Sequence, residues 1–477
     1  MKGFTYTIRI LIFSVYFLLF GSGLLQAQQA KYVFYFIGDG MGITHIAATE
    51  AYLAAKKQEI GYEKLSFSTF PTTGFANNHA LNRLITGSAA AGTALATGQK
   101  TTINTISMDG KRTQNLTSIA SIAKENGFKV GIISNVSINH ATPAVFYAHQ
   151  PDRNNYYEIG LDLINSRFDF FGGGGFNKFT GKNNDQPDLY LLAGQAGYHI
   201  SRGIEEFNAL KPGDQQVIAT SNFLTKSASQ QFVLDQGEAD IPLSRFIEKA
   251  IELLYGDEGF FIMAEEGNTD WASHANDGAT AIRNIKGLSD AVERAVEFYL
   301  KHPDETLIIV TADHETGGLS LGWSGKEYDT DLGLLQLQKV SSERFTYLID
   351  SVMKNPENQK FDVAMNMVTG YFGLGGELGL VLTDYEKKLL SEAWQVWRGE
   401  LQLSDTESKL RYGGGNPIAA SATRILNNKA GLGWTTWSHT GTPVPVFAIG
   451  QGHEKFTGYY DITDIPKRMK IAMGLSK

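Results

Sequence analysis

The sequence predicts an α/β protein: a three-layer sandwich in which helices flank a central, mostly parallel β-sheet. Two observations support this fold class. Short apolar runs rich in Val, Ile and Phe recur along the chain, which is typical of strands buried on both faces. Helical patterns lie between them, and strands that alternate with helices favour parallel pairing. The predicted strands are Tyr32–Ile37, Val130–Ser134, Phe260–Ala264, Leu307–Thr311 and Pro445–Ile449.

Two stretches between these strands have the pattern of helices, Leu116–Asn126 and Gly278–Lys301. In the longer one, apolar residues recur every three or four positions and therefore share one face. From about Leu319 to Leu432 the alternation gives way to helical and Gly-rich sequence. We expect this segment, at about residues 319–432, to be an insertion before the last strand of a single domain, residues 28–477. An insertion over the strand ends would shape the mouth of a site.

Residues 1–27 are predicted to be a signal peptide. Lys2 and Arg9 precede an apolar stretch, Ile10–Phe20, and small residues lead to a cleavage point near Ala27. The alternative is a buried or anchoring helix, but the apolar run is short for a bilayer. The chain has no cysteine, which excludes a lipid anchor through that residue. The sequence therefore predicts an exported protein, periplasmic or secreted, with no membrane anchor after signal removal.

The composition is that of a folded globular protein with an acidic balance. Of its 477 residues, 42% are hydrophobic and 19% charged, and 50 acidic residues outnumber 42 basic ones. No segment concentrates Lys and Arg, which argues against nucleic acid as a specific partner. Because there are no cysteines, any metal site must use histidine and oxygen ligands.

Acidic residues and histidines follow the predicted strands where each strand ends. Asp39 follows the first strand, Glu265 follows the third, and the pair Asp313-His314 follows the fourth. In open α/β sheets, ligands bind beyond the carboxyl ends of the strands. Each piece alone has a plainer explanation, since Gly-Asp-Gly is usually a turn and Asp-His after a strand often caps a loop. Their joint occurrence is what indicates a site.

A first ligand set consists of Asp270, His274 and His439. Asp270 and His274 are four residues apart, so that on a helical turn they share one face. His439 lies on the loop that enters the last predicted strand. A lone histidine in such a loop is more often structural, but two histidines with one carboxylate match a catalytic zinc site with an open position.

A second ligand set consists of Asp39, Asp313 and His314, again carboxylates with a histidine. Glu265 and Thr142 offer oxygen ligands, which suit a harder ion such as magnesium. The sequence therefore contains ligands for more than one metal ion.

Ser88 is the candidate nucleophile. It begins an Ala-rich stretch that reads as a short helix ending at Gly98. At a helix N-terminus, free backbone N–H groups and the helix dipole favour an anion. The alternative is that Ser88 is an ordinary N-cap, a position where serine is common.

Taken together, these residues resemble the alkaline phosphatase family across almost the whole mature length. The order and the spacing of the motifs match those of this family. Each motif alone is weak evidence for it, but their combination is highly specific. The matching segments are Gly38-Asp-Gly-Met-Gly42, Ser88-Ala-Ala-Ala-Gly-Thr-Ala94, His140-Ala-Thr-Pro-Ala-Val-Phe-Tyr-Ala-His149, Glu265 through Asp270 to His274, Thr311-Ala-Asp-His-Glu-Thr-Gly-Gly318 and Ser438-His-Thr-Gly441.

The resemblance implies a catalytic domain that hydrolyses small phosphate monoesters through a phosphoseryl intermediate, with two Zn²⁺ and one Mg²⁺. The first ligand set would hold the zinc that activates water, and the second the zinc that lowers the pKa of Ser88. Asp39, Thr142 and Glu265 would form the third, magnesium-type set. Arg153 corresponds to the arginine that binds the phosphate oxygens. The family is commonly homodimeric, and the 319–432 insertion is a candidate dimer contact.

The chain departs from the family pattern in three places. Gly87 stands where many relatives have an aspartate that orients the arginine, so we expect a more mobile Arg153 and weaker phosphate affinity. His140 and Trp271 stand where some relatives have an acidic residue and a lysine, so the family pattern does not determine the identity of the third metal ion.

The third departure is a second glutamate. Glu265 is followed by Glu266 instead of the usual glycine, which makes Glu266 a rival ligand. We assign Glu265 because the family's glutamate lies five residues before Asp270.

Other functions fit less well. A sulfatase of the same superfamily needs proline and arginine after its nucleophile, and Ser88-Ala-Ala-Ala-Gly92 has neither. A phosphodiesterase shares the metal pattern, but Arg153 favours a terminal phosphate. A non-catalytic metal- or phosphate-binding protein would be expected to have lost a ligand, and none is missing.

Overall fold

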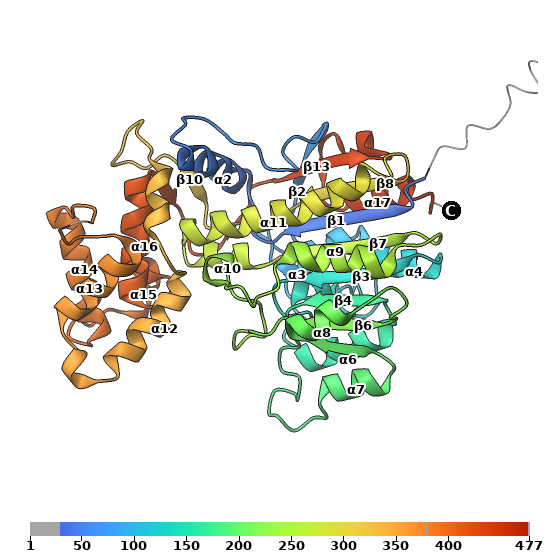
Figure 1. Ribbon diagram of the computed structural model, residues 1–477, viewed down its shortest axis with the longest axis horizontal. Coiled ribbons are helices and arrows are strands. Elements are labelled where there is room, and N and C mark those ends of the chain that lie inside the picture. Colours follow the sequence, from blue (N-terminus) through green and yellow to red (C-terminus); the bar gives the residue numbers. More distant parts are fainter. Residues whose placement is uncertain (1–28, 378, 476–477) are drawn as a thin grey trace, which may run out of the picture.

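A ten-stranded β-sheet forms the centre of the computed structural model, which describes residues 29–377 and 379–475 (Figure 1). At its middle, β1 (Tyr32–Gly38) pairs in parallel with β7 (Phe260–Glu266) and β8 (Thr306–Thr311), and all three strands are buried throughout. The strand order is β14-β2-β13-β8-β1-β7-β3-β4-β6-β5. Among the described strands of this sheet, only β13 (Val444–Gly450) runs antiparallel to its neighbours. The predicted mostly parallel α/β sandwich is confirmed.

All five predicted strands are present, as β1, β7, β8, β13 and β3 (Lys129–Ser134). The sequence analysis did not identify five further strands toward the two edges of the sheet. Four of these have only four residues, too few for a pattern to be recognised. They are β2 (Thr72–Asn77), β4 (Phe170–Gly173), β5 (His199–Arg202), β6 (Val217–Thr220) and β14 (Gly458–Asp461).

Successive residues of β1 pack against helices on opposite faces of the sheet. The ring of Phe34 lies 5.7 Å from that of Phe298 in α11, whereas the hydroxyl of Tyr35 donates to the carbonyl of Leu95 in α3 at 3.5 Å. This alternation explains why the strand reads as continuously apolar. The helices are α9 (Leu243–Leu254) and α11 (Gly278–Tyr299) on the first face, and α3 (Ser88–Thr97), α4 (Ile119–Glu125) and α17 (Asp464–Ala472) on the second.

A helical segment lies beside the sheet, at the left in Figure 1. It leaves from β10 (Leu319–Leu321) and returns through β11 (Leu432–Trp434), and these two strands pair with each other. Its helices form a hydrophobic cluster of their own, to which α2 (Ile43–Lys56) contributes Ala48 and Tyr52. They are α12 (Ser342–Met353), α13 (Phe361–Phe372), α14 (Asp384–Trp397), α15 (Asp405–Tyr412) and α16 (Pro417–Ala430).

The predicted signal peptide, residues 1–27, lies outside the described residues. Within residues 29–377 and 379–475, no helix has the length and apolar character needed to cross a membrane.

Candidate functional site

Neighbouring strand ends bring the predicted acidic residues to one edge of the sheet. In the register of the central strands, Ile37 is opposite both Glu265 and Thr311, so Asp39 and Asp313 follow at the same level. Asp39 is fully buried. Gly40 then turns the chain with φ +74°, and a side chain there would lie 2.8 Å from the Cα of Asp270. This turn therefore requires glycine, both for its φ and for the close approach.

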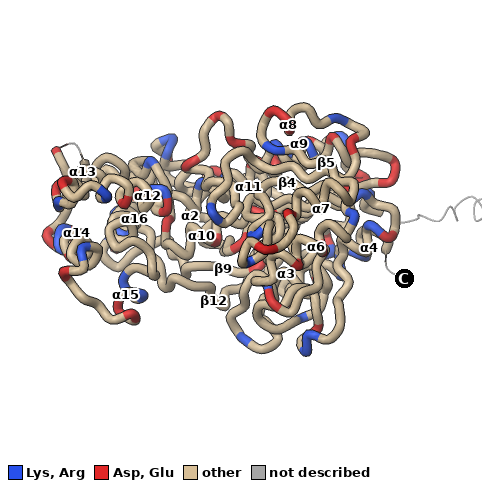
Figure 2. The backbone as a smooth tube through the Cα atoms, turned by 90° about the horizontal axis from the view of Figure 1, so that it is seen from below, with Lys and Arg blue, Asp and Glu red and all other residues tan. Residues whose placement is uncertain are grey.

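The three residues of the first ligand set lie close together in the structure. Asp270 and His274 lie on α10 (Asn268–His274), and one Asp270 oxygen is 3.4 Å from Nε2 of His274 and 3.5 Å from Nε2 of His439. The expected loop at His439 is in fact a short strand, β12 (His439–Thr440), which pairs with β9 (Glu315–Thr316). His439 lies opposite Thr316 in this pair, two residues after His314 of the second set, and the two strands lie side by side in Figure 2.

The hydrogen bonds of these two histidines determine which nitrogen is free. Nδ1 of His274 bonds to the carbonyl of Trp437 at 2.6 Å, and Nδ1 of His439 bonds to the carbonyl of Thr86 at 2.8 Å. A carbonyl only accepts, so each Nδ1 carries the proton and each Nε2 presents a lone pair. The two Nε2 atoms are 3.1 Å apart and both face Asp270. Two imidazole nitrogens and a carboxylate that converge in this way match a metal-ligand set.

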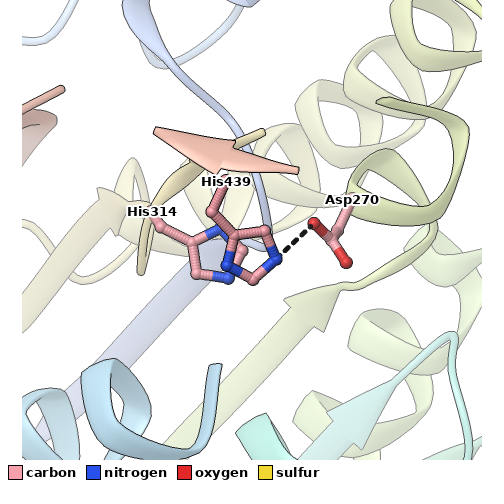
Figure 3. Close-up of side chains that lie close together, drawn as sticks. All are labelled: Asp270, His314 and His439. Atoms are coloured by element: carbon pink, nitrogen blue, oxygen red, sulfur yellow. Dashed lines mark ion pairs between the residues drawn. The ribbon is translucent and has the colours of Figure 1, made fainter. Parts of the chain in front are cut away.

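The second ligand set adjoins the first. Nε2 of His314 is 3.3 Å from carboxylate oxygens of both Asp39 and Asp313. The rings of His314 and His439 stack with centroids 3.6 Å apart, and ligand atoms of Asp270, His314 and His439 lie within 4.8 Å of one another (Figure 3). The two sets therefore form one continuous cluster of six ligand residues.

Thr316 links the two sets, a residue that the sequence analysis did not single out. Its hydroxyl donates to Asp270 at 2.5 Å and lies 3.2 Å from Nδ1 of His314. Because this hydroxyl donates to the carboxylate, it accepts from Nδ1–H of His314 and leaves Nε2 of that histidine as a ligand. The only indication of a role for Thr316 in the sequence was its position inside the segment Thr311–Gly318.

The third set includes a histidine in addition to the predicted oxygens. Ligand atoms of Asp39, His140 and Glu265 lie within 4.8 Å of one another, and the Thr142 hydroxyl donates to Asp39 at 3.3 Å. The edge of Trp271 faces the His140 ring at 5.9 Å. One oxygen of Asp39, one of Glu265 and Nδ1 of His140 are buried without a hydrogen-bond partner among the described residues.

The carboxylates of Glu266 and Glu265 have different hydrogen-bond partners. The Glu266 carboxylate accepts from the side chain of Asn135 at 2.7 Å and from the backbone N–H of Thr269 at 3.0 Å, at the start of α10. Glu265 instead accepts from the hydroxyl of Ser134 with one oxygen and turns the other toward Asp39. The structure therefore brings Glu265, and not Glu266, into the cluster.

Burial shifts the pKa values of several residues of the cluster. It raises the pKa of Glu265 to about 8 and, together with the charge of Asp270, the pKa of Asp313 to about 7. The pKa of Asp39 rises well above its usual range, first through burial and then through neighbouring carboxylates. Burial lowers the pKa of His314 and of His140 well below the usual histidine range, so both rings are neutral. Neutral imidazoles and crowded carboxylates are the forms that bind divalent metal ions.

Ser88 lies beside the second ligand set. Its hydroxyl is 3.3 Å from Nε2 of His314, and the residue is 2% exposed. The N-cap residue of α3 is Gly87, and no side chain caps the helix. The interpretation of Ser88 as an ordinary N-cap is therefore wrong. Ser88 is instead the first helical residue, with its side chain directed at the cluster.

Arg153 reaches the same cluster through His140. Its Nη2 donates to Nε2 of His140 at 2.8 Å, and no ion pair joins Arg153 to a carboxylate in the described part of the chain. Arginine cannot accept, so Nε2 of His140 accepts and Nδ1 carries the proton. His140 thus stands where it can orient the arginine. A side chain at Gly87 would have room, since its Cβ would meet only His439, at 3.8 Å.

The donor set fits divalent metal ions. Imidazole and carboxylate ligands suit zinc, and the oxygen-rich third set suits a harder ion. Carboxylate oxygens of Asp39, Asp313 and Glu265 are buried without hydrogen-bond partners among the described residues, and divalent cations would satisfy them. The hydroxyl of Ser88 contacts His314 of this donor set, and the guanidinium of Arg153 contacts His140.

Comparisons with known proteins identify the family. The alkaline phosphatase family model matches residues 30–475. Alkaline phosphatase 4 of Bacillus subtilis (strain 168) is 31% identical over 447 residues, which cover 91% of this chain and 87% of the relative. Alkaline phosphatase 3 of the same organism is 30% identical and covers 94% of this chain and 89% of the relative.

Solved structures agree on the fold. A cold-active alkaline phosphatase from Shewanella sp. has a TM-score of 0.76 at 28% identity, over 93% of this chain and 99% of the other. Alkaline phosphatase from Thermus thermophilus has a TM-score of 0.78 at 24% identity, over 96% and 95%. The chain therefore belongs to the alkaline phosphatase family of phosphomonoester hydrolases.

Proposed function

We propose that this chain hydrolyses small phosphate monoesters through a phosphoseryl intermediate on Ser88, with two zinc ions and one magnesium ion. The observation that carries the proposal is the placement of the Ser88 hydroxyl, 3.3 Å from Nε2 of His314 at the start of α3. Hydrolysis of phenyl phosphate by the purified chain, before and after chelation, tests it. Cleavage of diesters but not of monoesters would favour the diesterase alternative instead.

The residues that would hold the ions follow from the three sets. Asp270, His274 and His439 would hold one zinc, and Asp39, Asp313 and His314 the other. Asp39, Thr142 and Glu265 would hold magnesium, while His140 lies beside them with its Nε2 occupied by Arg153. When bound, such ions supply Lewis acidity and lower the pKa of coordinated hydroxyl groups.

The chain's own groups position the phosphate for in-line attack. The Ser88 oxygen attacks phosphorus and releases the alcohol, and a water molecule then attacks the phosphoserine from the opposite side to release phosphate. The N–H groups of the first turn of α3 point toward an anion at Ser88. Arg153 offers a planar pair of donors for two further phosphate oxygens. Phosphoryl transfer needs little more than this positioning and charge neutralisation.

Arg153→Ala is expected to lower kcat/KM by about 10- to 100-fold, because it removes charge-assisted hydrogen bonds to the transferred phosphoryl group. It should also weaken inhibition by inorganic phosphate. His140→Ala should produce a smaller effect of the same kind, since only the orientation of Arg153 is lost. Steady-state kinetics with phosphate as a competitive inhibitor measure both. Unchanged phosphate inhibition in Arg153→Ala would contradict the role of Arg153.

The third site is tested by a matched pair of variants. Glu265→Gln is expected to lower the bound magnesium to well below one ion per chain, because it replaces a carboxylate ligand by a neutral amide. Glu266→Gln is expected to keep the metal content, since this glutamate is already hydrogen-bonded by Asn135 and Thr269. Elemental analysis of the two purified proteins gives the result. The reverse pattern would assign the site to Glu266.

We also propose that residues 1–27 are removed on export to the periplasm or medium, and that residues 28–477 form one catalytic domain with an insertion at about 319–432. The charged and apolar pattern of the leader supports the first point. The pairing of β10 with β11, where the helical segment leaves and returns, supports the second. Intact mass of the exported protein would locate the cleavage point. Its molar mass in solution would test the homodimer that the family resemblance implies.

A further inference from the structure

A cavity opens directly beside the first ligand set. It has a volume of about 460 Å³ and lies between α10, which contributes Trp271 and His274, and the helical segment. The segment contributes the start of α12 and the loop 412–416 that connects α15 to α16. In Figure 2 this segment lies on the side of the molecule where α10, β9 and β12 are labelled. A group bound at His274 therefore has this cavity as its neighbour.

The lining of the cavity is aromatic and carries no basic side chain apart from His274. Trp271, Tyr347 and Tyr412 supply ring surface, and a run of glycines in the loop 412–416 supplies flat backbone. Glu343 is the only carboxylate among the described residues that line it. Basic side chains lie outside the lining: Lys226 is 6.0 Å from the ring of Tyr347, and the charges of Arg411 and Arg424 act on Tyr412.

The position of the glycine loop is tied to the ligand His274. Gly413 has φ +65°, and a side chain there would lie 2.6 Å from the ring of Trp437. The carbonyl of Trp437 is the group that accepts from Nδ1 of His274 at 2.6 Å. Trp437 therefore supports both the glycine loop that forms a wall of the cavity and the orientation of His274. This shared support fixes the position of the cavity relative to His274.

We infer that this cavity receives the alcohol part of the substrate, and that it selects esters of alcohols that carry a flat, uncharged ring over esters with a second negative charge. The inference rests on the proposed function, in which the departing oxygen lies at the Asp270, His274 and His439 set. A flat ring stacks on Trp271 and Tyr347 and gains more than its buried area alone provides. A second anion would have to approach Glu343 with no basic side chain in the lining to balance it.

Three phosphate esters of primary alcohols test this inference by their kcat/KM values: ethyl phosphate, benzyl phosphate and 4-carboxybenzyl phosphate. kcat/KM includes only steps in which the alcohol part is still attached, so it reports on this cavity. Benzyl phosphate is expected to exceed ethyl phosphate by about 3- to 10-fold, the usual effect of one aromatic contact. 4-Carboxybenzyl phosphate is expected to fall below benzyl phosphate by a similar factor.

Two variants connect these ratios to the cavity. Tyr347→Ala, at a position 51% exposed and so tolerant of truncation, should bring the benzyl-to-ethyl ratio close to one. Glu343→Gln should bring the carboxybenzyl value up toward the benzyl value. Tyr385→Ala, at an exposed position on α14 outside this cavity, is the matched control and should keep the wild-type ratios.

Equal kcat/KM values for the three esters, or a benzyl preference that survives in Tyr347→Ala, would overturn the inference while leaving the phosphatase activity in place. Failure of the wild-type protein to hydrolyse any of the three would overturn the proposed function and this inference with it. The two failures are therefore distinguishable in one set of measurements.

Discussion

Replacing Ser88 by alanine is expected to lower kcat on phenyl phosphate by at least roughly 10³-fold, because the variant has no group that can take up the phosphoryl group. The wild-type protein, quenched with acid during turnover, should carry one phosphoryl group by intact mass, and the variant none. Metal content should be unchanged, since Ser88 lies beside the ligands of the second set and is not needed to hold them together.

The control for this variant is Thr97→Ala, which removes a hydroxyl from the other end of the same helix. That hydroxyl donates to the carbonyl of Thr93 at 2.8 Å and faces no ligand. Thr97→Ala should therefore retain wild-type kcat and the phosphoprotein mass. If Ser88→Ala still traps phosphate on the chain, the nucleophile is another residue and the assignment fails.

Removal of metal ions is expected to abolish activity, by at least about 10³-fold, because Lewis-acid stabilisation contributes several kcal/mol to such reactions. Zinc and magnesium added together should restore it. The structural reason is that Nε2 of His274 and Nε2 of His439 lie 3.1 Å apart and both face the carboxylate of Asp270. Full activity in a protein that elemental analysis finds free of metal would refute the metal-dependent mechanism.

The metal-free protein should also lose stability as pH rises from about 6.5 to about 8. Glu265 and Asp313 have folded pKa values of about 8 and about 7, above their ordinary values of 4.5 and 3.8. In this window the folded state holds protons that the unfolded state has released, so the free energy of unfolding falls with pH. Below pH 6.5, histidines with lowered pKa values such as His314 act in the opposite direction and offset the trend.

Thermal unfolding of the chelated protein at pH 6.5, 7.25 and 8 measures this effect. The metal-loaded protein is the control, because bound cations keep the carboxylates ionised and remove the dependence. A metal-free midpoint that rises over this interval would contradict the electrostatic description of the cluster.

The sequence by itself determined the central layers of the fold. A strand such as Tyr32–Gly38 is buried on both faces, so its apolar run is visible without any knowledge of its neighbours. The helix Gly278–Tyr299 shows its buried face through its own spacing. The short strands at the sheet edges carry no such local signal, because their stability comes from pairing with strands far away in the sequence.

The sequence also identified which residue types gather at the strand ends, since parallel strands deliver their carboxyl ends to one edge. It did not decide how those side chains pair. Thr316 between Asp270 and His314, and His140 beneath Arg153, are contacts that only the packing of separate elements produces.

The two adjacent glutamates show the physical reason most directly. Side chains of successive strand residues point to opposite faces, so either Glu265 or Glu266 can reach a given site, but not both. The choice depends on the register of β7 against β1, which places Ile37 opposite Glu265. The family spacing had already assigned Glu265, but the physical reason for it is a register, a relation between two segments of the chain that only the tertiary structure specifies.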